Sequence, residues 1–124
     1  MVQAKSSHPH NIKNYFMKII WVIVSCNTIN EAKKIGQELL NQRLVACFEI
    51  IPRLGTWFFW PPKKNKIEST KGCFLVLDTL SKYFAKIEKV VKKLHSDKTP
   101  FIGSIELKRV NAKYVKWLKG ELKK

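Results

Sequence analysis

The segment QRLVACFEIIP at residues 42–52 decides how this chain of 124 residues folds. Its polar start is typical of a helix end, and its apolar continuation up to a proline predicts a buried strand directly after that helix. Three further segments follow it in a fixed order, and the other elements can be placed around them: WPPKKNKIE at 60–68, LHSDKTPFI at 94–102 and VNAKYVKWL at 110–118.

Hydrophobic periodicity around these segments predicts alternating strands and helices. Apolar residues at helical spacing predict helices that begin at Thr28, Ser81 and Asn111. Thr28 and Glu31 have the form of a capping box, with a hydroxyl and a carboxylate at the right spacing. Apolar runs rich in Ile and Val favour strands over four segments, at 17–26, 44–51, 66–78 and 100–110.

The second strand is expected to be long and bent. Pro52 and Gly55 interrupt it, and it resumes in extended form over 56–60 before a hairpin tip at 61–64. The complete order is strand, helix, strand, strand, helix, strand, helix. Two split crossover units in this order predict an α+β, ferredoxin-like fold (βαββαβ plus a C-terminal helix) with an antiparallel sheet.

Length and composition favour one domain without a membrane segment. Residues 1–16 are polar and lack periodicity, so we expect a flexible leader before a single domain at 17–124. The longest apolar run, at 19–24, is shorter than the roughly 20 residues of a membrane span and the roughly 7–15 of an export signal core. Three cysteines without CxxC spacing suit reduced thiols, so a cytoplasmic location is expected.

The chain is strongly basic. It has 24 Lys and Arg against 9 Asp and Glu, a net charge of +15. Such a charge favours contact with nucleic acid or an acidic surface. The alternative is that most of these lysines are ordinary solvated residues on the outer faces of helices, such as Lys82, Lys86, Lys89 and Lys93.

Together the four segments resemble the CutA family of divalent-cation-tolerance proteins. The usual family pattern is RLxACxNIxP, then WxGKIE, then HPYxxPEI, then GNxxYxxWL, and the resemblance covers roughly residues 18–122. It implies a ferredoxin-like homotrimer involved in divalent metal ion tolerance, with copper as the expected cation. Asp78 stands where members commonly have a lysine, so the charge is reversed at that position.

His95 and Cys26 are the candidate metal ligands. His95 is the only histidine inside the predicted domain and matches the histidine of the HPYxxPEI pattern. We expect it at a helix end, exposed by a turn. The resemblance implies a copper site with histidine and cysteine ligands beside a cleft between subunits, and a thiolate beside an imidazole suits soft or borderline metals. The cysteine found in some family members falls on Val24, two residues before Cys26.

Other interpretations of these and neighbouring residues stay open. His95 could be a solvated helix-end histidine, and Cys26 a thiol at a strand end. His8 and His10 could chelate copper or nickel, or be incidental residues of the leader. Cys47 and Cys73 are expected to be small core residues.

Four consecutive aromatic residues suggest a subunit interface. Alternation along a strand must place two of them on each face, and one domain core buries only one pair. The other pair is then covered by another subunit or, alternatively, by Tyr114 and Trp117 of the last helix. The predicted interface residues are Trp57, Phe58, Phe59 and Trp60.

Several function classes are disfavoured. The sequence has no GxSxG, Walker, GxGxxG or HExxH motif, so we expect no enzyme activity. An RNA-recognition module would share the fold class, but Cys73 and Leu75 occupy the strand positions where its stacking aromatics belong. A small-ligand regulatory trimer similar to PII-type signal proteins is a further alternative, although no nucleotide-binding loop is evident.

Overall fold

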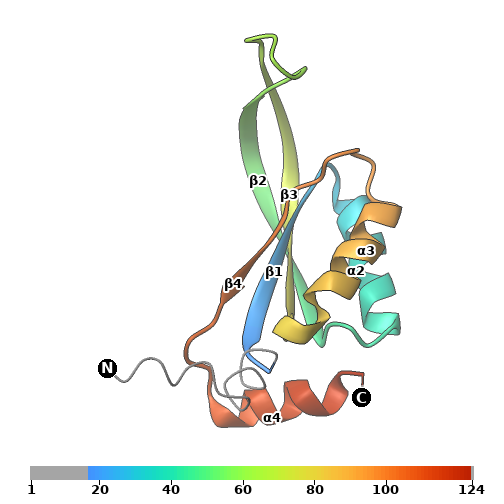
Figure 1. Ribbon diagram of the computed structural model, residues 1–124, viewed down its shortest axis with the longest axis vertical. Helices are drawn as coiled ribbons and strands as arrows, with labels where there is room; N and C mark the ends of the chain where they lie inside the picture. The colour runs from blue at the N-terminus through green and yellow to red at the C-terminus, as the bar shows by residue number, and fades with distance from the viewer. Residues whose placement is uncertain (1–16, 124) are drawn as a thin grey trace, which may run out of the picture.

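The computed structural model describes residues 17–123, and the predicted leader at 1–16 lies outside them (Figure 1). A short 3-10 turn, η2, precedes the second long helix. The elements in chain order are β1 (Ile19–Cys26), α2 (Ile29–Asn41), β2 (Cys47–Phe59), β3 (Ile67–Leu80), η2 (Ser81–Tyr83), α3 (Phe84–Leu94), β4 (Ile102–Glu106) and α4 (Ala112–Glu121).

The strands form one antiparallel sheet in the order β2-β3-β1-β4. This order and the element sequence confirm the predicted α+β, ferredoxin-like arrangement. Helices α2 and α3 lie together on one face of the sheet, and α4 lies across the end of the sheet where β1 begins (Figure 1). We call the sheet surface opposite α2 and α3 the open face.

The core fills the space between the sheet and its two long helices. Ala32, Ile35 and Leu39 of α2 are fully buried against it. Gly36 faces the Phe48 ring of β2, so Phe48 points toward the helices. Because side chains alternate along a strand, Cys47 and Glu49 point to the open face.

The β2–β3 hairpin is long and bent, as predicted. Its register shifts between Arg53 and Thr56, and Gly72 opposite has a φ of +155°, a conformation that favours glycine. The hairpin extends beyond the helices, which is visible as the upper projection in Figure 1. Side chains at its far end therefore have no helix to pack against.

Three details differ from the sequence predictions. Leu40, predicted to face inward, is 37% exposed because it lies one position past the buried side of α2. The fourth strand covers only Ile102–Glu106, since its pairing with β1 runs from Val24 to Ile20. A 3-10 turn precedes the second helix, and its Tyr83 is buried in the core. The sequence prediction missed this core residue, because it counted inward positions by helical spacing only from Phe84 onward.

Candidate metal centre

The two predicted ligands lie in one cluster with a third residue. Cys26 is the last residue of β1, Glu31 lies in the first turn of α2, and His95 follows the last residue of α3. One ligand atom from each lies within 4.8 Å of the other two. The fold therefore brings together a thiol, a carboxylate and an imidazole from three elements.

His95 is buried, which corrects the expectation that a turn exposes it. The residue is 8% exposed, because the chain leaves α3 in an extended conformation that turns the ring toward β1. The Asp97 amide donates to Nδ1 at 3.0 Å, so Nε2 carries the proton and donates to the Ser25 carbonyl at 2.6 Å. The ring thus joins β1 to the loop after α3.

Glu31 holds the same corner together through its carboxylate. It accepts from the Asn27 amide at 3.0 Å and from the Ser96 amide at 2.7 Å. Thr28 caps α2 as predicted, but the carboxylate bonds to Asn27 rather than to Thr28. Burial works to raise the pKa of Glu31, but these hydrogen bonds and nearby His95 outweigh it and lower the pKa below its usual value.

The Cys26 thiol is enclosed. Burial, followed by the neighbouring Cys73 and Glu31, raises the pKa of Cys26 to about 12, so the free thiol keeps its proton at neutral pH. Cys73 is its direct partner on β3 and is fully buried, as expected for a core residue. A cation that binds here has to displace the Cys26 proton.

Cys47 does not lie in the core, which corrects the sequence interpretation. It is half-buried on the open face, and its thiol forms a second cluster with Glu49 and Asp78 whose ligand atoms lie within 4.8 Å of one another. Sequence reasoning missed this cluster. The available signals were the reversed charge at Asp78 and the i, i+2 spacing of Cys47 and Glu49, but the pairing of β2 with β3 was needed to join them.

The predicted interface residues are all exposed on the hairpin. Trp57, Phe58, Phe59 and Trp60 are 72%, 39%, 69% and 49% exposed. Covering by the last helix is excluded, because α4 lies at the other end of the sheet (Figure 1). The Trp117 ring instead contacts the Tyr114 ring in a tilted arrangement, with ring centroids 5.3 Å apart.

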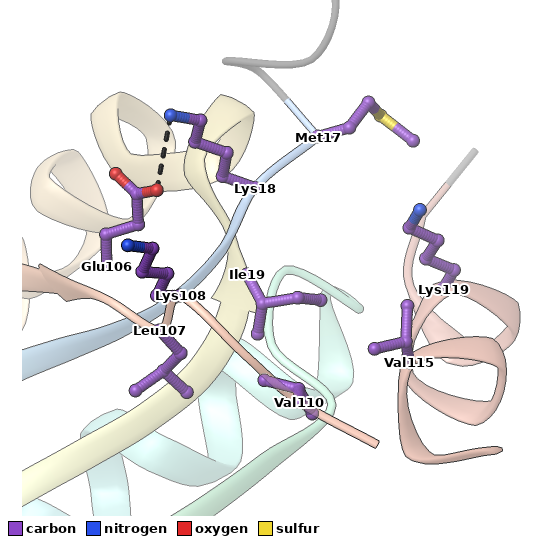
Figure 2. Close-up of a pocket in the computed structure, with 9 residues that line it drawn as sticks. All are labelled: Met17, Lys18, Ile19, Glu106, Leu107, Lys108, Val110, Val115 and Lys119. Atoms are coloured by element: carbon purple, nitrogen blue, oxygen red, sulfur yellow. Dashed lines mark ion pairs between the residues drawn. The ribbon is translucent and has the colours of Figure 1, made fainter. Parts of the chain in front are cut away.

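Two basic concave regions lie away from both thiol clusters. One is a cavity of about 360 Å³ where Lys18 pairs with Glu106 at 3.2 Å, and Lys108 and Lys119 flank apolar side chains (Figure 2). The other is a groove of about 740 Å³ between α3 and the segment that follows α2, lined by Lys86, Lys89, Lys92, Lys93 and Lys123. Neither offers a thiol or imidazole, so these regions suit anions rather than soft cations.

Two further sequence expectations can be compared with the structure. Cys73 and Leu75 are fully buried toward the helices, so they do not occupy the outward positions that the sequence argument against an RNA-recognition module assigned to them. Phe74, which lies between them, points to the open face and is half-buried. Among residues 17–123, no helix is both long enough and apolar enough to cross a membrane.

Comparisons with known proteins agree with the fold and the sequence pattern. The family model of the CutA1 divalent ion tolerance protein matches residues 20–121. The divalent-cation tolerance protein CutA of Pyrococcus horikoshii is 34% identical over 93 residues, which are 75% of this chain and 87% of that protein. The CutA of Archaeoglobus fulgidus is 30% identical over 98 residues, 79% of this chain and 92% of that protein.

Solved structures give the same result. The structure of the periplasmic divalent cation tolerance protein CutA from Archaeoglobus fulgidus has a TM-score of 0.79 and 28% identity, and covers 85% of this chain and 99% of its own. CutA1 from Pyrococcus horikoshii has a TM-score of 0.77 and 30% identity, with the same coverage of 85% and 99%. The chain therefore belongs to the CutA1 divalent ion tolerance protein family.

Proposed function

We propose that this protein binds a copper ion through Cys26, Glu31 and His95 and acts in divalent-cation tolerance through that binding. The observation that carries the proposal is the convergence of three different donor groups within 4.8 Å. Family membership supports it, because relatives such as the Pyrococcus horikoshii protein are named for divalent-cation tolerance.

Copper fits this donor set better than the hard divalent cations. Thiolate favours Cu(I), imidazole binds both copper oxidation states, and copper stands highest in the affinity order of the first-row divalent metals. Glu31 adds a carboxylate whose pKa is lowered, so it is ionised at neutral pH. Mg²⁺ and Ca²⁺ would instead select a site made of oxygen ligands.

Binding requires a local rearrangement. Both ring nitrogens of His95 already have hydrogen bonds. The ring nitrogen nearer to Glu31 is Nδ1, which lies 3.8 Å from the Oε2 atom of Glu31. A cation bound to Nδ1 takes the place of the Asp97 amide hydrogen. The loop that begins at Ser96 therefore has to move on binding.

The experiment is a titration of the full chain with cuprous and cupric copper in competition with a chromophoric chelator, with Zn²⁺ as the comparison cation. We expect a saturable copper equivalent that is lost in both Cys26→Ala and His95→Ala. The double variant His8→Ala/His10→Ala should keep it, because it removes only the histidines of the first ten residues.

Two outcomes would contradict the proposal. One is copper binding no tighter than millimolar in the unmodified chain. The other is binding that survives Cys26→Ala and His95→Ala but disappears with His8→Ala/His10→Ala, which would assign chelation to the leader. Cys26→Ala is the more informative variant, because replacing one small buried residue by another perturbs folding less than removal of His95.

The proposed assembly is a homotrimer in which the hairpin aromatics contact neighbouring subunits. Four adjacent aromatic side chains that are each more than one third exposed support it. We also propose a non-catalytic protein of the cytoplasm, since none of the three cysteines forms a disulfide.

A polyanion partner remains a second candidate, and one observation favours it. Five lysines line the groove beside α3, and among the partners within residues 17–123 only Lys92 has an ion pair, with Glu88 at 3.3 Å. If nucleic acid binds there, the logarithm of the association constant should fall linearly with the logarithm of the salt concentration. The variant Lys89→Glu should bind nucleic acid more weakly. A PII-like role would instead require a small anion, for which the cavity beside Lys18, Lys108 and Lys119 is a basic candidate place.

A further inference from the structure

A second group of metal-binding side chains lies on the open face, at the end of the sheet near α4. Cys47 pairs directly with Asp78 across β2 and β3, so both side chains point the same way. Glu49 lies two residues along β2 on the same face. The thiol, one oxygen of Glu49 and one oxygen of Asp78 lie within 4.8 Å of one another, and the Cys47 Sγ lies 3.5 Å from Glu49 Oε2.

Asp78 carries an unsatisfied oxygen. The residue is 7% exposed, and Tyr114 of α4 donates a hydrogen bond to Oδ2 at 2.5 Å. Oδ1 has no hydrogen-bond partner within the described part of the chain. A buried carboxylate oxygen without a partner costs free energy, and a bound cation is one way in which proteins satisfy it.

Within the described residues, neither of the two carboxylates forms an ion pair with a cationic side chain. The chain has 24 Lys and Arg, yet none of the ion pairs formed within residues 17–123 includes Glu49 or Asp78.

The electrostatic consequences agree with that geometry. Burial and then the charge of Asp78 raise the pKa of Glu49. Burial, followed by the charges of Glu49 and Asp78, raises the pKa of Cys47 to about 11. Negative charge therefore accumulates at this point of an otherwise basic molecule, and a divalent cation would neutralise it.

We propose that Cys47, Glu49 and Asp78 form a binding site for a borderline divalent cation of the Zn²⁺ type. One thiolate and two carboxylates suit Zn²⁺, which accepts sulfur and oxygen ligands with little geometric preference. Binding forms the Zn–S bond and releases the Cys47 proton to solvent, with no change of oxidation state. Tyr114 is a positioning residue that holds Asp78 in place through Oδ2.

This site is separate from the proposed copper centre and does not depend on it. Cys73, the partner of Cys26, precedes Asp78 by five residues on β3, which is about 17 Å along the strand. An odd separation also places the two on opposite faces of the sheet. The two sites share no ligand, so either proposal can be refuted without affecting the other.

The test uses Co²⁺ as a spectroscopic substitute for Zn²⁺ in the metal-free full chain carrying Cys26→Ala, which removes the thiol of the other centre. We expect one equivalent of Co²⁺ to produce thiolate-to-Co²⁺ charge-transfer absorption, which Zn²⁺ then abolishes by competition. Adding Cys47→Ser should remove this absorption. Adding Glu49→Gln should weaken binding by about tenfold or more, since even outer-shell substitutions cost roughly that much.

The matched control is Glu68→Gln, an exchange of the same kind on β3, which should leave the affinity for Co²⁺ unchanged. Glu49 is exposed and Cys47 half-buried, so neither substitution threatens the fold. No charge-transfer absorption, or absorption that persists after Cys47→Ser, would overturn the proposal. Loss of one copper equivalent in Cys26→Ala with retained Co²⁺ binding would support both sites independently.

Discussion

At the scale of single residues, His95 shows how burial changes the role of a side chain. A histidine at a helix end is usually solvated, but here both ring nitrogens bond to the protein, one of them to the Ser25 carbonyl at 2.6 Å. The ring therefore connects β1 to the loop after α3, whether or not a metal binds.

His95→Ala should consequently destabilise the metal-free protein. Removing the ring takes a donor away from the carbonyl of the half-buried Ser25, and an unsatisfied buried group costs about 1–3 kcal/mol. Urea unfolding in the presence of a chelator should show a lower midpoint with an unchanged slope. Lys98→Ala in the same loop is the control and should change stability by less than about 0.5 kcal/mol, because Lys98 is exposed. Equal stability of both variants would show that His95 is not structurally important.

The thiols give a second prediction, which concerns reactivity and pH. The pKa of Cys47 is raised from 9.0 to about 11, chiefly by burial, so its thiolate fraction is small at neutral pH. Below the pKa that fraction rises tenfold per pH unit, and the rate of alkylation follows it. In chelator-treated protein, iodoacetamide labelling of Cys47 should still accelerate above pH 9, where an ordinary thiol levels off. Mass spectrometry should find Cys26 and Cys73 unlabelled until the protein unfolds.

At the scale of elements, the contact between α2 and β2 depends on a glycine. A Cβ at Gly36 would lie 2.7 Å from Cδ2 of Phe48, closer than carbon atoms approach without a shift. The close approach of the helix to the sheet therefore requires a residue without a side chain at this position.

Gly36→Ala should destabilise the protein by about 1–3 kcal/mol, since overpacking outweighs the roughly 1 kcal/mol that alanine gains in a helix. Gly120→Ala in α4 is a matched control, because nothing lies within 4 Å of the added Cβ. That variant should be stabilised by about 0.5–1 kcal/mol. Thermal unfolding of both variants measures the contrast.

A double variant identifies the cause. Phe48→Leu should reduce the destabilisation produced by Gly36→Ala, because the smaller side chain leaves room for the new methyl group. If the two effects simply add, the clash with Phe48 is not the reason.

At the scale of the whole molecule, the β2–β3 hairpin and helix α4 lie at opposite ends of the sheet. The aromatic hairpin projects beyond both long helices, whereas α4 closes the opposite end (Figure 1). A hairpin with four exposed aromatics is a surface that suits assembly, and the proposed homotrimer follows from it.

Native mass spectrometry tests this assembly. The unmodified chain should have three times the mass of the 14.5 kDa chain, and Trp57→Ser/Phe59→Ser should shift it toward the single chain, because these two side chains are the most exposed of the four. Leu40→Ser replaces an exposed apolar residue of α2 and should leave the mass unchanged. A single-chain mass for the unmodified protein would refute the trimer.

Much of the fold could be predicted because its signals are local. Apolar runs and helical spacing gave the order of elements, and Pro52 with Gly55 indicated the bend that appears as the register shift between Arg53 and Thr56. The ends of β4 and the exposure of Leu40 were predicted less well, since pairing and packing rather than local preference decide where an element ends.

The sequence by itself determined the family, the α+β class and the residues His95 and Cys26 as one candidate pair. Only the tertiary structure decided that His95 is buried, that Glu31 completes its cluster, and that Cys47, Glu49 and Asp78 meet on the open face. The physical reason is the range of the interactions. Periodicity reflects neighbours within a few positions, whereas these clusters depend on the pairing of strands and on loops that join residues up to 70 positions apart.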